Sequence, residues 1–350
     1  MDREPSEELS VVPPRAECLH WGLIGASDIA AKRMIPALRA AGQDVRRVYS
    51  RNGEWGRQFA TQHSIPEVVG TLSEAVAEGV DAVYVSSTND QHARDVLAAA
   101  GAGRHVLCEK PLAIALEEGV SMVAACKAAG VVLATNHHLR NAALVRRVRQ
   151  MVCGGEVGEV LAARVTHAIL LPERLRSWRV RGASGGSGVV FDIAVHDIDT
   201  VRFVLGQEVV EVAATTAMQG LGTGGAEDAA VTCLTMASGV LVMMYQAFTV
   251  PFGGTALQVD GASASVIARD ILSLEAEGEV ELRDTHGWHR LARGGAGDVY
   301  GLSVRAFVES VYGRGVPTAN GEDGVASLAV AIAIRESAEA GKRVRVKYGL

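Results

Sequence analysis

Hydrophobic residues in the first third of the chain form short, unbroken runs separated by segments with helical spacing. The runs predict strands at 19–24, 45–50, 82–87, 105–109 and 131–136, and the spacing predicts helices at 29–41, 93–100 and 116–129. Strands that are apolar throughout and alternate with helices are typical of a parallel sheet covered on both faces. Ligands bind such sheets beyond the carboxyl ends of the strands, so the polar residues after each run are the first candidates for a site.

The pattern changes after residue 138. Strands are predicted at 160–171, 209–216, 229–236, 240–248, 256–260 and 265–271, and helices at 139–153, 189–205, 304–313 and 325–340. Consecutive strands without helices between them indicate an antiparallel or mixed sheet. We therefore expect a disordered extension at 1–18, one α/β domain at 19–138 and a second α/β domain at 139–350.

Composition and charge narrow the class of protein. The 350 residues carry 34 Lys and Arg against 40 Asp and Glu, a formal net charge of −6, and no basic cluster. We therefore expect no nucleic acid and no membrane as a partner. The first residues lack the pattern of a signal peptide, and the five cysteines are scattered without a CxxC pair. This favours a reduced, cytoplasmic protein without disulfides or structural zinc.

The first predicted strand runs into a loop that resembles a dinucleotide-binding turn. The segment WGLIGASDIA, residues 21–30, matches the pattern GxGxxA with a serine in place of the second glycine. Gly25 permits the tight turn, Ser27 is small enough for a pyrophosphate to approach the backbone, and Ala30 permits close helix packing. The alternative is an ordinary strand-to-helix turn that binds nothing.

The end of the second strand suggests which nucleotide would bind. Enzymes that use NAD commonly have Asp or Glu about 20 residues after the loop, where it binds the ribose 2′-hydroxyl. Here the strand ends in Ser50 and Arg51, and no carboxylate follows before Glu54. Because a guanidinium fork suits a phosphate, we predict that NADP(H) is preferred, with NAD(H) possible. The alternative is that Arg51 is a surface residue of a loop.

Three polar clusters are expected to meet at the same edge of the sheet. They are Glu109-Lys110-Pro111, Asn136-His137-His138 and the segment FDIAVHDIDT at 191–200. Hydride delivery to a ketone creates an alkoxide that needs a proton and electrostatic support. Lys110 can supply both, and His196 can donate or accept the proton. Asp192 precedes His196 by one helical turn and is predicted to orient and charge its imidazole.

Other interpretations of these residues remain open. Lys110 could be a solvated lysine at a strand end, and His196 a core histidine. Asp192 and His196 could also bind a metal together with His137 or His138. We predict no metal, because Lys110 would place a cation beside it. His92 follows the strand at 82–87, where packing at a helix start is an alternative to a role in the site.

Several motifs together resemble the glucose–fructose oxidoreductase/inositol dehydrogenase (Gfo/Idh/MocA) family over residues 19–350. They are the GASDIA loop, the sequence Glu109-Lys110-Pro111 and the pair Asp192 and His196. The segments TNHHLRNAA at 135–143, GVVFDIAVHDIDT at 188–200 and GEDGVASLA at 321–329 fit one subgroup of that family. The subgroup has an arginine where this chain has Trp55, so Arg51 would carry the phosphate-binding charge from another position.

The resemblance implies an N-terminal NADP-binding Rossmann domain and a C-terminal substrate-binding α/β domain. That second domain has a large, open, mostly antiparallel sheet that also joins subunits in many members. It implies that Lys110 polarises a substrate carbonyl, that its bond to Pro111 is cis, and that His196 and Asp192 assist as acid/base and support. Together with the patterns above, the expected cofactor-binding residues are Gly25, Ala26, Ser27, Asp28, Ile29, Ser50, Arg51, Ser86, Ser87, Thr88, Asn89, His92, Glu109, Lys110, Asn136, Trp178 and Arg179.

The predicted function is that of an oxidoreductase acting on CH-OH groups, which reduces a small-molecule, sugar-like ketone with NADPH. Three alternatives remain. One is an NAD(P)-dependent dehydrogenase of another pyranose or polyol, of the glucose, xylose or inositol type. The second is a non-catalytic NADP-binding regulator, against which the intact set of catalytic residues argues. The third is a metal-dependent hydrolase.

Overall fold

The apolar runs of the first domain form a six-stranded parallel sheet in the order β3-β2-β1-β4-β5-β6. Its strands are β1 (His20–Ile24), β2 (Asp44–Tyr49), β3 (Glu67–Val69), β4 (Ala82–Val85), β5 (His105–Cys108) and β6 (Leu133–Thr135). The strand order reverses between β1 and β4, and in such sheets ligands bind at this point. The computed structural model describes residues 17–182, 186–274 and 277–349, so the predicted extension lies almost entirely outside the described residues.

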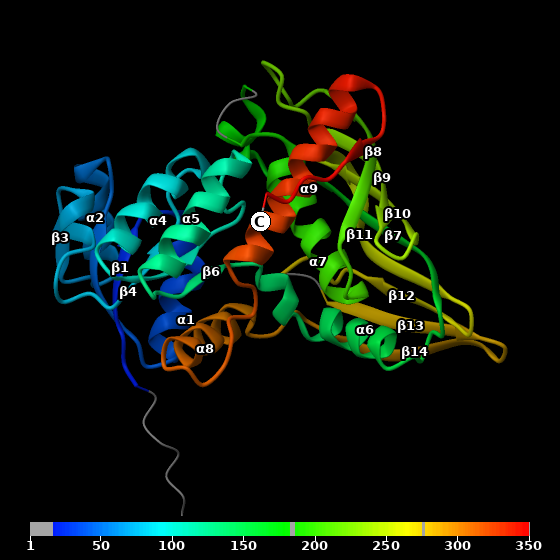
Figure 1. Ribbon diagram of the computed structural model, residues 1–350, viewed down its shortest axis with the longest axis horizontal. Helices are drawn as coiled ribbons and strands as arrows, with labels where there is room; N and C mark the ends of the chain where they lie inside the picture. The colour runs from blue at the N-terminus through cyan, green and yellow to red at the C-terminus, as the bar shows by residue number, and fades with distance from the viewer. Residues whose placement is uncertain (1–16, 183–185, 275–276, 350) are drawn as a thin grey trace, which may run out of the picture.

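Helices cover both faces of this sheet (Figure 1). They are α1 (Ile35–Ala40), which continues a π-helical turn at Ala30–Met34, α2 (Gly53–Gln62), α3 (Leu72–Ala75), α4 (His92–Gly101) and α5 (Leu116–Ala128). The predicted helices here are confirmed to within a few residues, but α2, α3 and β3 were missed. The sequence of α2, GEWGRQFATQ, is mostly polar because the helix buries little besides Phe59 and Ala60. Asn52 caps α2 by accepting a hydrogen bond from the amide of Trp55.

The second domain is built on a nine-stranded mixed sheet in the order β14-β13-β12-β11-β7-β10-β9-β8-β15. Its strands are β7 (Val160–Leu170), β8 (Val209–Ala217), β9 (Ala229–Met236), β10 (Leu241–Ala247), β11 (Thr249–Gly261), β12 (Ser265–Arg269), β13 (Gly278–Asp284), β14 (Gly287–Gly294) and β15 (Val344–Arg345). Strands β7 and β10 pair in parallel, and the other pairs are antiparallel. The predicted fold class is thereby confirmed.

Helices α6, α7 and α9 lie on one face of this sheet, α7 and α9 lie between the two sheets, and α8 packs beside α1 of the first domain (Figure 1). Their bounds are α6 (Ala143–Cys153), α7 (Val195–Leu205), α8 (Val299–Val311) and α9 (Gly321–Ala340), and a π-helical turn at Val190–Ala194 leads into α7. On the open face of the sheet, Val231, Leu241 and Met243 are more than half exposed, whereas Val242 and Met244 are buried. The sheet therefore has one solvent-facing and one core-facing side.

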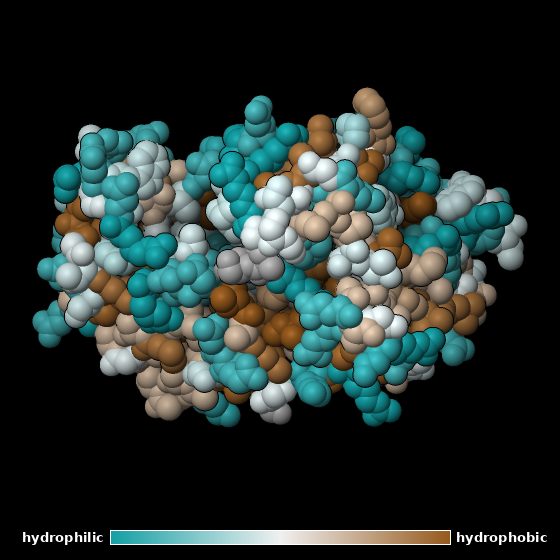
Figure 2. All heavy atoms as spheres, turned by 90° about the horizontal axis from the view of Figure 1, so that it is seen from above, coloured by the Kyte–Doolittle hydropathy of each residue, from teal (hydrophilic) through white to brown (hydrophobic). Residues whose placement is uncertain are grey.

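Three strands of the second sheet, β13, β14 and the two-residue β15, were not predicted. Strands β13 and β14 form a hairpin with the sequences GEVELRD and GWHRLARG. Charged residues alternate with apolar ones over most of β13, and β14 carries Arg290 and Arg293. Edge strands that are half exposed bury few side chains, so their apolar signal is weak. Seen from above, hydrophobic and hydrophilic residues are intermixed over both domains (Figure 2). Among the described residues, no helix is both long and apolar enough to span a membrane.

Candidate active site

A cleft of 660 Å³ lies at the carboxyl ends of β1, β2, β4 and β5, where the second domain covers the first. The second domain contributes the segment around Trp178 and Arg179, the start of the α7 run, and Tyr300 at the start of α8. The structure brings all but one of the sequence-predicted residues to the wall of this cleft. The exception is Asn136, which is buried behind Glu109.

The dinucleotide-type loop is pressed against the end of β4. Gly25 has φ = +111°, and a Cβ atom there would lie 2.7 Å from backbone atoms of Ser86 and Ser87, so only glycine fits. The hydroxyl of Ser27 donates to that of Ser86 at 2.8 Å and accepts from the amide of Ala30 at 3.1 Å. Asp28 and Ile29, just before the helix that starts at Ala30, line the cleft. A helix start that faces a cleft suits a pyrophosphate.

The end of β2 forms the rim of the cleft on the side expected for the ribose. Arg51 places Nη2 3.4 Å from the hydroxyl of Thr88, which follows β4. Trp55, in the position where the subgroup has an arginine, donates from its indole to the carbonyl of Ala26 at 2.8 Å. Trp55 therefore fixes the loop through a hydrogen bond, and Arg51 supplies the positive charge at this rim of the cleft.

Behind Glu109, hydrogen bonds fix the ends of the central strands. One oxygen of Glu109 accepts from the hydroxyl of Tyr84 at 2.6 Å and from the amide of Asn136 at 2.7 Å. Burial first and the charge of Glu109 second raise the pKa of Tyr84, which therefore stays a donor. The ring nitrogens of His92 face the carbonyls of Pro111 and Ser87 at 2.9 and 3.1 Å. His92 lines the cleft and also joins the turns that follow β4 and β5.

Lys110 reaches across the cleft to the second domain. Its peptide bond to Pro111 is cis. Its Nζ donates to the carbonyl of Asp192 at 2.8 Å and lies 3.3 Å from the carboxylate, whose other oxygen accepts from Arg179 at 3.1 Å. Burial favours a higher pKa for Asp192, but Lys110 and Arg179 prevail and lower it. Asp192 is thus ionised at neutral pH, and the third N–H of the Lys110 ammonium has no partner in the part of the chain that the structure describes.

His196 lies beside Lys110 in a neutral state. Its ring is edge-on to those of His138 and His137, with centroids 5.1 and 6.4 Å apart. Burial first, and Lys110 and His138 next, lower the pKa of His196 well below 6.5. Its Nδ1 is buried and has no hydrogen-bond partner among the described residues.

The expectation that Asp192 would orient and charge the imidazole of His196 is therefore wrong. The oxygens of Asp192 are engaged by Lys110 and Arg179, and His196 forms no ion pair with another described residue. A metal at Asp192 would have to displace Lys110 and Arg179 from its carboxylate. Among residues 17–182, 186–274 and 277–349, no group of three or more His, Cys, Asp and Glu side chains is arranged to hold a metal.

Sequence reasoning missed several residues of the cleft wall, among them Tyr300 and Arg174. Tyr300 stacks on His138, with ring centroids 4.9 Å apart and planes 23° apart, and its hydroxyl lies 3.5 Å from the histidine Nδ1. Arg174 approaches Asp28 of the loop, with Nη1 3.9 Å from the carboxylate. Neither belongs to a motif: the only signal at Tyr300 is the capping Asp298 of α8, which indicates a helix start and not a site.

Fold and cleft together define an oxidoreductase with a Rossmann domain. Residues 19–137 match the model of the oxidoreductase family with an NAD-binding Rossmann fold, and residues 145–267 match that of the GFO/IDH/MocA C-terminal domain. The chain is 43% identical to 1,5-anhydro-D-fructose reductase of Ensifer adhaerens over 94% of its own length and 99% of that protein. The chain belongs to the Gfo/Idh/MocA family.

More distant relatives show how far the likeness extends. A myo-inositol 2-dehydrogenase of Thermotoga maritima is 29% identical over 77% of this chain and 80% of that protein. Among solved structures, an aldose-aldose oxidoreductase of Caulobacter crescentus complexed with glycerol superposes with a TM-score of 0.86 at 24% identity, covering 94% of this chain and 100% of that one. A levoglucosan dehydrogenase in complex with NADH and levoglucosan gives 0.85 at 21% identity, covering 95% and 100%. At such identities, the structures show the shared fold alone.

Proposed function

We propose that this protein reduces a sugar-like ketone with NADPH, and that its substrate is 1,5-anhydro-D-fructose, which yields 1,5-anhydro-D-mannitol. The observation that carries the proposal is the Lys110–Asp192 pair beside a neutral His196 at the end of β5. The relative from Ensifer adhaerens, whose name states this ketone as substrate, supports the choice of sugar.

The residues of the cleft divide the work of a carbonyl reduction. Bound NADPH would supply the hydride, held over the loop at Gly25 and the ends of β4 and β5. Lys110 places its ammonium where the negative charge of the carbonyl oxygen develops, which stabilises the alkoxide and supplies its proton. Asp192 and Arg179 hold Lys110 in this direction. The neutral His196 offers a second proton-exchanging group close by.

The preference for NADP(H) rests on the rim of the cleft. Ser50, Arg51 and Thr88 line it, and the carboxylate near them, Asp90, comes from the turn after β4 and not from the end of β2, and hydrogen-bonds to Thr88. A 2′-phosphate would accept charge-assisted hydrogen bonds from Arg51 and hydroxyl donors from its neighbours. One relative, a D-xylose 1-dehydrogenase of Haloferax volcanii, is named for NADP(+), whereas levoglucosan dehydrogenase is seen with NADH.

The test is a panel of keto-sugars assayed by NADPH oxidation. We expect 1,5-anhydro-D-fructose to give the highest kcat/KM, and NADPH to exceed NADH. Arg51→Ala should lower kcat/KM for NADPH by about 10- to 100-fold, the loss of one or two charge-assisted hydrogen bonds, and leave that for NADH nearly unchanged. Equal use of both nucleotides by the unaltered protein would overturn the NADP preference. Inactivity on every ketone would overturn the reductase itself.

The names of the relatives favour one alternative, a dehydrogenase of another pyranose or polyol. Running the panel in the oxidative direction with NADP+ and NAD+ on myo-inositol and D-xylose distinguishes it from the ketone reductase. Turnover in either direction would also exclude a non-catalytic NADP-binding regulator.

Assembly and location complete the proposal. The open face of the second sheet, with Val231, Leu241 and Met243 exposed, is a surface through which two copies could pair as a homodimer or larger homo-oligomer. The five cysteines are free thiols, which fits the reducing cytoplasm.

A further inference from the structure

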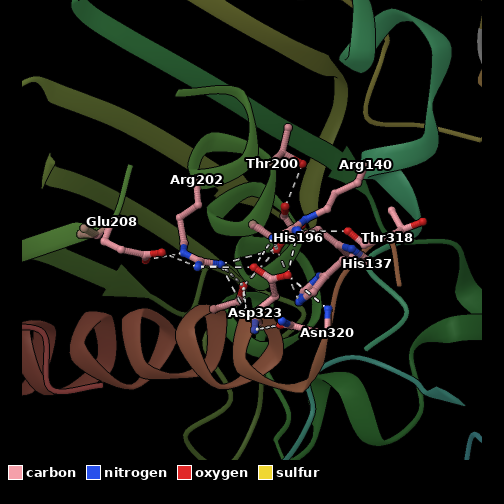
Figure 3. Close-up of polar contacts among 12 residues, drawn as sticks. His137, Arg140, His196, Thr200, Arg202, Glu208, Thr318, Asn320 and Asp323 are labelled. Carbon is pink, nitrogen blue, oxygen red and sulfur yellow. Dashed lines mark hydrogen bonds and ion pairs between the residues drawn. The ribbon is translucent and has the colours of Figure 1, made fainter. Parts of the chain in front are cut away.

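A second cluster of charged residues surrounds α7, apart from the wall of the cleft. Figure 3 shows its side chains pointing toward one another from the segment after β6, from α7 and from the start of α9. We call it the Arg140 cluster, and its members are His137, Arg140, Asp199, Arg202, Glu208 and Asp323. Nothing in the proposed reaction uses it.

Arg140 is the centre of the cluster and is almost completely buried. Its Nε and Nη2 donate to the two oxygens of Asp199 at 2.8 and 2.7 Å. Its Nη1 and Nη2 donate to those of Asp323 at 2.9 and 2.8 Å, and Nη1 also donates to the carbonyl of Thr318 at 3.1 Å. These contacts use all five N–H donors of the guanidinium. A lysine, with three donors and no planar fork, could not reproduce them.

The partners of Arg140 belong to segments that carry or support the catalytic residues. Asp199 follows His196 by one turn of α7, and Thr200 donates to the carbonyl of His196 at 2.9 Å. Asp323 is part of the capping box that begins α9, a helix that packs on α5 and β6 of the first domain. Arg140 itself lies in the short turn after β6, two residues beyond His138.

The contacts of Arg140 join segments on both sides of the boundary between the two domains, and the proposed reaction uses residues from both domains. Lys110 comes from the first domain and His196 from the second, so their relative position depends on how α7 is held against the segment after β6. We propose that Arg140 is a positioning residue that sets the place of His196 relative to Lys110. The inference rests on the proposed function, because it assigns Arg140 to that same reaction.

Arg202 offers a matched control within the same cluster. It is equally buried and also forks onto a carboxylate, donating to Glu208 at 2.6 and 2.7 Å. Among the described residues, none of its hydrogen bonds or ion pairs reaches the segment after β6. Its other contacts are to Asp199 of its own helix and to residues of α9. Loss of the Arg202 fork should therefore cost stability without separating His196 from Lys110.

The test compares Arg140→Lys with Arg202→Lys in the full-length protein. For R140K we expect kcat to fall by about 10- to 100-fold, the scale of a misplaced catalytic group, while the Kd of NADPH stays near its original value. The isotope effect with NADPH deuterated at the transferred hydrogen should increase, because the chemical step becomes slower. R202K should lower the melting temperature about as much as R140K does, but its kcat should stay that of the unaltered protein. Equal kcat losses in both variants, or none in R140K, would overturn the inference.

Two further measurements keep the test decisive. If R140K does not fold, Asp323→Asn takes its place, because it weakens two of the five bonds and leaves Asp199 intact. If the unaltered protein reduces no ketone, the proposed function fails by itself, and amide hydrogen exchange then tests Arg140 alone. R140K must lower the protection of the His196 turn more than R202K does, and equal protection in the two would contradict a positioning role.

Discussion

Two charged clusters share one helical run and use their charges differently. Asp192, at the start of the run, holds Lys110 and Arg179 at the edge of the cleft, where each is partly exposed. Asp199, about two turns further on, holds Arg140 in the interior, where both side chains are almost inaccessible. Among the described residues, one N–H donor of Lys110 has no partner, whereas all five donors of Arg140 are engaged.

The difference separates charge that acts on a ligand from charge that holds the fold. An ammonium with a donor to spare can follow the charge that develops on a reacting oxygen. A guanidinium with every donor engaged cannot, but it fixes the segments around it, because breaking a buried pair leaves an uncompensated charge. Substitutions at the cleft should therefore mainly lower kcat, whereas substitutions in the interior cluster should mainly lower the free energy of unfolding.

Removal of the cleft cation should have the largest effect on catalysis. Lys110→Met keeps the length of the side chain and loses the charge that faces the substrate oxygen. We expect kcat to fall by about 100- to 1,000-fold or more, the cost of one lost oxyanion donor, while NADPH titrated by fluorescence binds nearly as before. Lys127→Met, at an exposed lysine of α5, is the control and should behave like the unaltered protein. A K110M enzyme with intact kcat would abolish the distinction between the clusters.

The two aspartates provide the next comparison. Asp192→Asn should reduce kcat by about 10- to 100-fold, since a misdirected Lys110 loses part of its effect, and should shift the melting temperature little. Asp199→Asn, in contrast, should be clearly destabilising. It should lower the free energy of unfolding by about 3–5 kcal/mol, because Arg140 loses a buried charged partner. Steady-state kinetics and urea unfolding of both variants measure this. If D192N proves the less stable of the two, the assignment of the clusters is wrong.

Much of the site could be predicted because its residues directly follow regular, buried elements. Lys110 and Glu109 end a strand, and Ser86 to Asn89 follow another, so the geometry of a parallel sheet brings them together. Residues on the α7 run were found from a motif with helical spacing. The roles of these residues remain predictions until the variants are measured.

The partners of these residues could not be predicted. Asp192 takes Lys110 and Arg179 in place of His196, and Arg179 comes from an irregular segment without a periodic pattern. Tyr300 and Asp323 enter from helices far along the chain, where the sequence indicates a helix start but not what the helix faces. Motifs indicate which residues lie at the ends of strands and helices. Which of these side chains contact one another depends on how the two domains pack.

The smallest expected effect concerns the two histidines that stand between the clusters. Burial first, and Lys110 next, lower the pKa of His138 to about 3, and burial lowers the pKa of His137 to about 4. In the unfolded chain both titrate near 6.5. Between about pH 6.5 and 4 the unfolded state therefore binds protons that the folded state excludes, so stability falls as the pH falls, by up to about 1.4 kcal/mol per pH unit for each histidine.

Urea unfolding between pH 7.5 and 5 tests this on the unaltered protein, His138→Asn and His137→Asn. Each variant should flatten the loss of stability with acid by about one proton, whatever its stability at pH 7.5. Equal flattening is expected although His138 faces the cleft and His137 the Arg140 cluster, because burial is the largest cause in both. If only H138N flattens the curve, His137 is already protonated against Asp199, 3.8 Å away, and the interior cluster holds one more charge than the comparison allows.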